Sequence, residues 1–141
     1  MQKLTIVSLV ASLTACGAPL QQRLSDHTQK IYQDYINYAK FTEAFLKFRS
    51  EDLGLELSKE KIKKQLKDPD SANFRNVRYV SFKSEGRLIC GEYNAKNSYG
   101  AYVGYRLFVG SPAEVTTEQE NPNKVYTKTL DSEALRVVCS I

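Results

Sequence analysis

Three cysteines and one histidine are the residues of this chain whose chemistry would suit metal binding or redox work. They are Cys16, Cys90, Cys139 and His27, in a chain of 141 residues that has no tryptophan. No two cysteines have the C-x-x-C spacing of a metal or redox centre, and His27 is far in sequence from the last two. We therefore expect no metal site and no cofactor.

Nucleophilic catalysis needs a serine or cysteine beside a base, and the sequence gives no sign of that arrangement. The short motifs of serine hydrolases, zinc peptidases, P-loops and dinucleotide-binding folds are all absent. Asp68 and Asp70 form a carboxylate pair, but solvated turn residues explain them better than a general acid and base. No catalytic residue is predicted.

The N-terminal residues have the pattern of a secretory signal peptide. Lys3 is followed by an uncharged, mostly apolar run over residues 4–13, too short for a membrane span of about 20 residues. The next residues complete the stretch Leu13-Thr14-Ala15-Cys16, which resembles the lipobox of bacterial lipoproteins. The resemblance implies removal of residues 1–15, lipid on Cys16 and a short tether over residues 16–20. Secretory cleavage without lipid and an uncleaved buried helix are the alternatives.

A lipid on Cys16 would make the membrane itself a partner of the protein. Two or three acyl chains hold a protein on a bilayer effectively permanently, because each buried CH₂ contributes about 0.8 kcal/mol. Gly17 stands where an aspartate tends to retain Gram-negative lipoproteins in the inner membrane. The resemblance therefore favours the inner leaflet of the outer membrane, with the folded part facing the periplasm.

The other two cysteines then form an even pair in an oxidising compartment. One intramolecular disulfide between Cys90 and Cys139 is the simplest arrangement. It would close a loop of about 50 residues and stabilise the fold by roughly 4 kcal/mol. Two separate buried thiols are the alternative.

Helical periodicity dominates the first half of the chain. Residues 21–50 contain neither glycine nor proline and carry an apolar stripe with a seven-residue repeat, which favours a helix laid on a sheet. Residues 51–57 contain Gly54 and are expected to form a turn. Ser58 is then a suitable N-cap for a short helix over residues 59–67.

The second half of the chain changes to the two-residue period of strands. The expected strands are residues 77–82, 87–94, 101–109, 125–130 and 135–141, with loops at 95–100 and 110–124. Helices first and strands after predict an α+β fold, in which the long and the short helix pack on an antiparallel β-meander of four to five strands. The long helix is expected to cover one face. Residues 21–141 would form this single domain.

Two short stretches add a resemblance. Residues 66–74 read LKDPDSANF and residues 89–104 read ICGEYNAKNSYGAYVG. Together they resemble small lipoproteins and envelope proteins of bacteria and of phages or prophages, whose function is unassigned. The resemblance implies location and fold, and it implies no chemistry.

A polar patch within the second stretch is the candidate binding site. It consists of Glu92, Asn94, Lys96, Asn97, Tyr99 and Tyr102. Asparagine, lysine and glycine also suit a plain hairpin loop, which is the simpler interpretation. Loops carry function disproportionately, however, and exposed tyrosines make good contact residues.

The expected function is that of a lipid-anchored, non-enzymatic interaction module that binds an envelope protein or polymer. A phage-related form would block a receptor and exclude superinfection. The alternative is an envelope hydrolase or another enzyme with an unrecognised site. Basic and aromatic residues do alternate in the strands (Arg87, Tyr93, Tyr105, Arg106 and Phe108), as on a platform for single-stranded nucleic acid. The net charge of only +4 and the extracytoplasmic location argue against a nucleic-acid partner.

Overall fold

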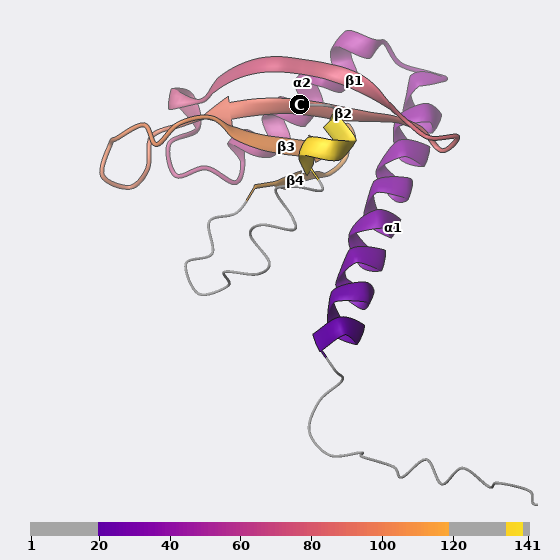
Figure 1. The fold of residues 1–141 in the computed structure, drawn as a ribbon. Coiled ribbons are helices and arrows are strands. Elements are labelled where there is room, and N and C mark those ends of the chain that lie inside the picture. Colours follow the sequence, from indigo (N-terminus) through magenta and orange to yellow (C-terminus); the bar gives the residue numbers. More distant parts are fainter. Residues whose placement is uncertain (1–19, 119–134, 140–141) are drawn as a thin grey trace, which may run out of the picture.

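Two helices are followed by a four-stranded antiparallel sheet, which confirms the expected α+β class (Figure 1). A computed structural model describes residues 20–118 and 135–139, with side chains from Thr28 onward. Its strands lie in the order β1-β2-β3-β4, so each strand pairs with its neighbour in sequence. The elements are α1 (Leu20–Leu46), α2 (Glu51–Lys63), a 3-10 turn (Pro69–Ser71), β1 (Asn73–Phe82), β2 (Gly86–Asn94), β3 (Arg106–Gly110) and β4 (Val115–Thr117).

The sheet is covered by helices on both faces. On one face Leu88 and Cys90 of β2 pack with Tyr35 and Tyr38 of α1. On the opposite face Ile89 packs in a second cluster with side chains of α2. Successive residues of a strand point to opposite faces, so burial of both faces explains why β2 is apolar without alternation. The expectation that the helices pack on the sheet is confirmed, and α2 adds a covered face that the sequence did not predict.

The long helix α1 is only partly attached to the sheet. Among its described side chains, from Thr28 onward, the buried ones are Tyr35, Tyr38, Ala39 and Thr42, all in its second half. With 27 residues at 1.5 Å each, the helix is about 40 Å long. Its N-terminal turns extend beyond the sheet (Figure 1).

The turn expected at residues 51–57 is wrong, because these residues belong to α2. Ser50, rather than Ser58, caps the helix by accepting a hydrogen bond from the Leu53 N–H at 3.3 Å. Gly54 is a packing residue, since a Cβ at this position would collide with the Tyr79 hydroxyl. Glycine often marks a turn in a sequence. Here, however, Gly54 lies within a helix, and its missing side chain lets the Tyr79 hydroxyl approach the helix surface.

The strands expected after residue 100 also differ from those in the structure. β3 begins at Arg106 rather than at residue 101, and β4 lies within the expected loop at 110–124. Residues 135–139 are helical instead of extended. The periodicity explains the error, because Leu135 and Cys139 would share a face in a helix as well as in a strand. Val137 distinguishes the two, since a strand would place it on that same face and it is 73% exposed. The expected strand at 125–130 lies outside the described residues.

Candidate functional site

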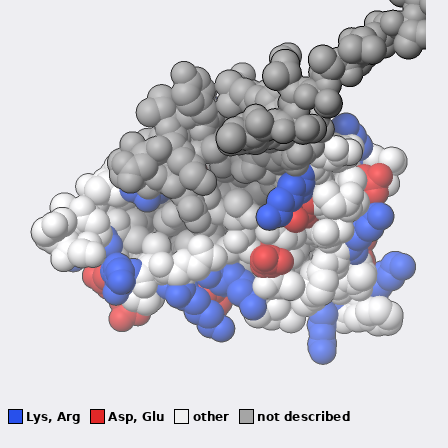
Figure 2. Space-filling model, turned by 90° about the horizontal axis from the view of Figure 1, so that it is seen from below, with Lys and Arg blue, Asp and Glu red and all other residues white. Residues whose placement is uncertain are grey.

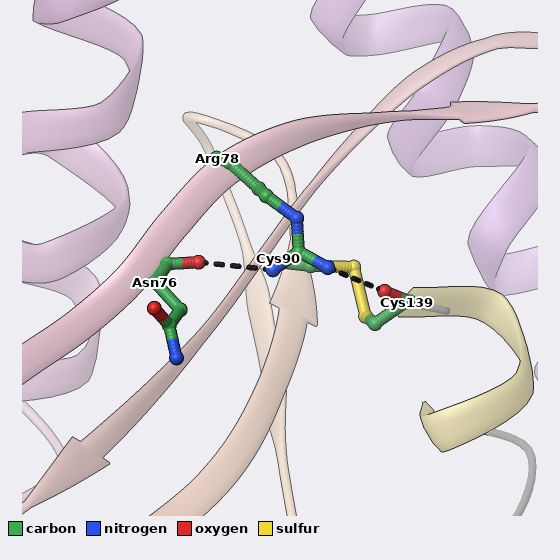
Figure 3. The surroundings of a disulfide bond; sticks show 4 residues. All are labelled: Asn76, Arg78, Cys90 and Cys139. Carbon is green, nitrogen blue, oxygen red and sulfur yellow. Dashed lines mark hydrogen bonds between the residues drawn. A yellow bond between two sulfur atoms is a disulfide. The ribbon is translucent and has the colours of Figure 1, made fainter. Parts of the chain in front are cut away.

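A disulfide joins the middle of the sheet to the helical residues 135–139. Cys90 of β2 and Cys139 are bonded, with their Cα atoms 5.8 Å apart, and both are fully buried (Figure 3). Arg78 of β1 adds a polar contact, because its Nη2 donates to the Cys139 carbonyl oxygen at 2.6 Å and its Nη1 donates to the Asn76 carbonyl oxygen at 3.1 Å. The expected pairing is thus present in the structure. Burial shields both sulfurs from attacking thiols, which suits a structural crosslink.

Glu92, the first residue of the expected patch, is paired with residues of β1 across the sheet. Its carboxylate accepts two hydrogen bonds from Arg75, at 2.9 and 2.8 Å, and a third from the Asn76 side chain at 2.9 Å. The Arg75 guanidinium in turn lies 3.8 Å from the centre of the Tyr105 ring. Hydrogen bonding from Arg75, and then from Asn76, holds the pKa of Glu92 below its usual value. Glu92 is therefore a structural ion-pair residue.

Replacing Glu92 by glutamine should destabilise the fold in a pH-dependent way. At pH 7 we expect a loss of about 1 to 2 kcal/mol, because Arg75 is left without its charged partner. The folded-state pKa lies below the unfolded value near 4.5, so the pairing stabilises above that value and is lost as the pH falls through the folded-state pKa. Urea denaturation of both proteins between pH 7 and pH 3 should show the difference shrinking.

The matched control is Glu56→Gln. The Glu56 side chain is 64% exposed and pairs only with Lys59 on the same helix, so this change should cost less than about 0.5 kcal/mol. A Glu92→Gln effect as small as the control, or one that is constant with pH, would show that the Arg75 pairing carries no stability.

The remaining patch residues after Asn94 lie in one ordered loop, residues 95–105, which we call the tyrosine loop. The Asn97 Oδ1 accepts hydrogen bonds from the backbone N–H groups of Tyr99 and Ala101, at 2.9 and 3.1 Å. Asn97 therefore shapes the loop from within. Asn94 is half-buried, and its Oδ1 has no hydrogen-bond partner in the part of the chain that the structure describes.

The two stretches that carry the resemblance contact each other. The Ser71 Oγ accepts a hydrogen bond from the Lys96 N–H at 2.9 Å, and the Ser71 carbonyl oxygen accepts one from the Tyr102 hydroxyl at 3.1 Å. Ser71 also donates to the Asp68 carbonyl oxygen at 2.8 Å. The serine of the first stretch thus fastens the tyrosine loop to the end of the 3-10 turn, so both stretches have a structural role.

Large side chains on the tyrosine loop face solvent. Tyr99 is 94% exposed, and about half of the surface of Tyr102, Val103 and Tyr105 is exposed. The loop projects from the end of the sheet that lies farthest from α1 (Figure 1). Apolar and aromatic surface held on a hydrogen-bonded loop is suited to contact with a partner.

A groove of about 290 Å³ lies beside the tyrosine loop, where the loop meets the residues after α2. Its lining residues are Ile62, Gln65, Leu66, Lys67, Tyr93, Ala95, Lys96, Asn97, Val103, Gly104, Arg106 and Thr117. Among these described residues are three basic side chains and no aspartate, glutamate, histidine, cysteine or serine. The positive charge of this lining suits an anionic group.

The groove was missed at the sequence level, because its basic side chains come from separate segments. Lys67 follows α2, Lys96 lies in the tyrosine loop and Arg106 opens β3. The one available signal is that Lys67 and Lys96 lie within the two stretches that carry the resemblance. Those stretches meet through the pairing of β1 with β2 and through the hydrogen bonds of Ser71 to the tyrosine loop.

The alternating basic and aromatic residues do not form an exposed platform. Phe108 and Tyr93 are buried, and Arg87 donates to Glu43 at 2.8 Å and to Glu51 at 2.6 Å. On the face seen in Figure 2, basic side chains lie in separate groups with acidic neighbours. Such a distribution differs from the continuous basic groove that tracks a nucleic-acid backbone.

Residues 1–19 lie outside the described residues, and with them the expected signal peptide, Cys16 and most of the tether. No helix in the described part is both long and apolar enough to cross a membrane. In that part no three His, Cys, Asp or Glu side chains gather as they would around a metal ion. Comparisons of the chain with protein-family models, with curated proteins and with solved structures give no match.

Proposed function

We propose that this protein is a lipid-anchored envelope protein that binds another envelope component through the tyrosine loop, without catalysing a reaction. The observation that carries the proposal is the exposure of Tyr99, Tyr102, Val103 and Tyr105 on a loop held by internal hydrogen bonds. A fixed loop loses little conformational entropy when it binds, which favours recognition.

The anchor is proposed from the lipobox-like stretch that ends in Cys16. A fully buried disulfide is in keeping with an oxidising compartment such as the periplasm. If the lipid is on Cys16, α1 begins four residues later, and its turns before Ile31 would separate the sheet from the membrane by about 15 Å. The tyrosine loop, at the far end of the sheet, would then be presented to periplasmic partners.

A binding role fits the groove better than an enzymatic one. Its described lining residues include no serine, cysteine, histidine, aspartate or glutamate, the side chains that most often serve as hydrolytic nucleophile and base. The resemblance to phage-encoded lipoproteins adds one specific form of the proposal, in which the bound component is a receptor that the protein blocks against a second phage. An envelope hydrolase is the competing function.

Photo-crosslinking in cells tests the binding role. We expect a photoreactive aromatic residue at position 99 to give an adduct with an envelope component, because Tyr99 is the most exposed side chain of the loop. Position 48 is the matched control, since Phe48 is an aromatic residue that is 84% exposed but lies at the end of α1. Identical adducts from both positions, or none from position 99, would contradict the proposal and favour the alternative.

A further inference from the structure

We infer that the groove beside the tyrosine loop binds an acidic peptide segment of a partner protein. The inference deepens the proposed function, because it rests on the tyrosine loop being a binding surface and names the chemistry of what binds there. Three features of the groove each favour this class of ligand: its basic side chains, its partly apolar lining and the backbone beside it.

Charge selects an anionic ligand. Lys67 and Lys96 line the groove from opposite sides, one after α2 and the other in the loop, and both are exposed. No described lining residue carries a negative charge, so a carboxylate in the groove would meet two ammonium groups and no like charge. This arrangement differs from Arg87, which is already paired with Glu43 and Glu51.

The groove is also partly apolar, which a free anion would not use. Ile62 and Tyr93 are buried beneath it, while Leu66 and Val103 are only partly covered. A ligand that alternates acidic and apolar side chains would satisfy both kinds of surface. Short acidic segments of proteins have this character, whereas a sugar phosphate offers no comparable apolar group.

The backbone beside the groove favours a peptide over other anions. Gly104 and Tyr105 make no backbone hydrogen bond within the described part of the chain, although they directly precede β3. Gly104 has φ +101° and nothing within 4 Å of where a Cβ would stand, so a second chain meets no obstacle beside its Cα. An extended peptide can pair with such groups by main-chain hydrogen bonds, in the manner of strand addition.

Two arrays of immobilised short peptides test the inference with the purified full-length chain in detergent. The first array contains peptides with several Asp and Glu among apolar residues, and the second has Asn and Gln at the same positions. We expect binding to members of the acidic array that weakens as salt is added, with amide-exchange protection over residues 62–67 and 95–106. The double variant Lys67→Gln/Lys96→Gln should bind about three- to tenfold more weakly.

The matched control is Lys47→Gln/Lys64→Gln, which removes the same charge from exposed positions outside the groove and should bind like the wild type. Equal binding to both arrays, equal weakening in both double variants, or protection away from the groove would overturn the inference. So would competition by vesicles of anionic lipid but not by the acidic peptides. Protection of the groove without any peptide would assign it to another part of the chain itself and would also overturn the inference.

The proposed function fails by different results. Absence of lipid on Cys16, or of adducts from position 99, would refute the proposed function. The peptide arrays are independent of both results, because they require neither the lipid nor a cellular partner. Adducts from position 99 together with failed peptide binding would leave the proposed function intact and remove only this inference.

Discussion

Reduction of the disulfide between Cys90 and Cys139 is expected to lower the free energy of unfolding by about 4 kcal/mol. The two residues are 49 apart in sequence, so the crosslink restricts a long loop in the unfolded chain. Domains of this size have a net stability of about 5 to 15 kcal/mol. The loss would therefore be a large part of the total and exceeds that expected for Glu92→Gln.

Reduction of the disulfide should also loosen residues 135–139 within the folded protein. Without the disulfide, residues 135–139 keep the Arg78 hydrogen bond to the Cys139 carbonyl oxygen and the burial of Leu135. One hydrogen bond contributes only about 1 kcal/mol, so this short helix should separate from the sheet before the rest unfolds. Amide exchange at residues 135–139 would then increase on reduction while exchange in β2 stays slow.

Urea denaturation with and without a reductant measures the global effect. The variant Cys90→Ala/Cys139→Ala is the control, because its midpoint should be low and should not respond to the reductant. An unchanged midpoint for the reduced wild type would contradict the stabilising role of the disulfide.

The elements that the sequence predicts well are those whose signal is local. The apolar stripe that includes Tyr38 identifies α1, and the break between the expected strands at 77–82 and 87–94 correctly separates β1 from β2. The disulfide was also predictable, because removing Cys16 from the count leaves one possible pair. In each case a short stretch or a simple count contains the needed information.

The errors arise where tertiary contacts decide. Gly54 lies within a helix, where its missing side chain leaves room for the Tyr79 hydroxyl, and no local pattern reveals this contact. Leu135 and Cys139 enter one buried cluster, but their spacing fits a helix and a strand alike, so the sequence pattern does not decide between them. Tertiary contacts also decide how the residues of the candidate patch are distributed, since Glu92 pairs across the sheet with Arg75 while Lys96 joins Lys67 at the groove.

Replacing Cys16 by serine is expected to have the largest effect on the protein in the cell. Serine cannot receive the lipid through a thioether, so the variant should lose its acyl chains and leave the membrane fraction almost completely. No helix in the described part of the chain is long and apolar enough to span a bilayer. Fractionation of cells by centrifugation, followed by detection of the protein, measures the effect.

The control for this change is Thr14→Ser, which keeps a small hydroxyl residue at the same distance from the cysteine. This variant should remain in the membrane fraction in the same amount as the wild type. Equal membrane recovery of Cys16→Ser and of the control would show that something other than lipid on Cys16 holds the protein there.

The most direct test of a lipid-anchored protein is the intact mass of the wild type purified from membranes. We expect a mass that lacks residues 1–15 and exceeds the mass of residues 16–141 by that of the acyl groups, after allowance for one disulfide. Proteolytic digestion, followed by mass analysis of the peptides, should place the added mass on the peptide that begins with Cys16. A mass equal to that of the full 141 residues, or of a cleaved chain without acyl groups, would contradict the lipid anchor.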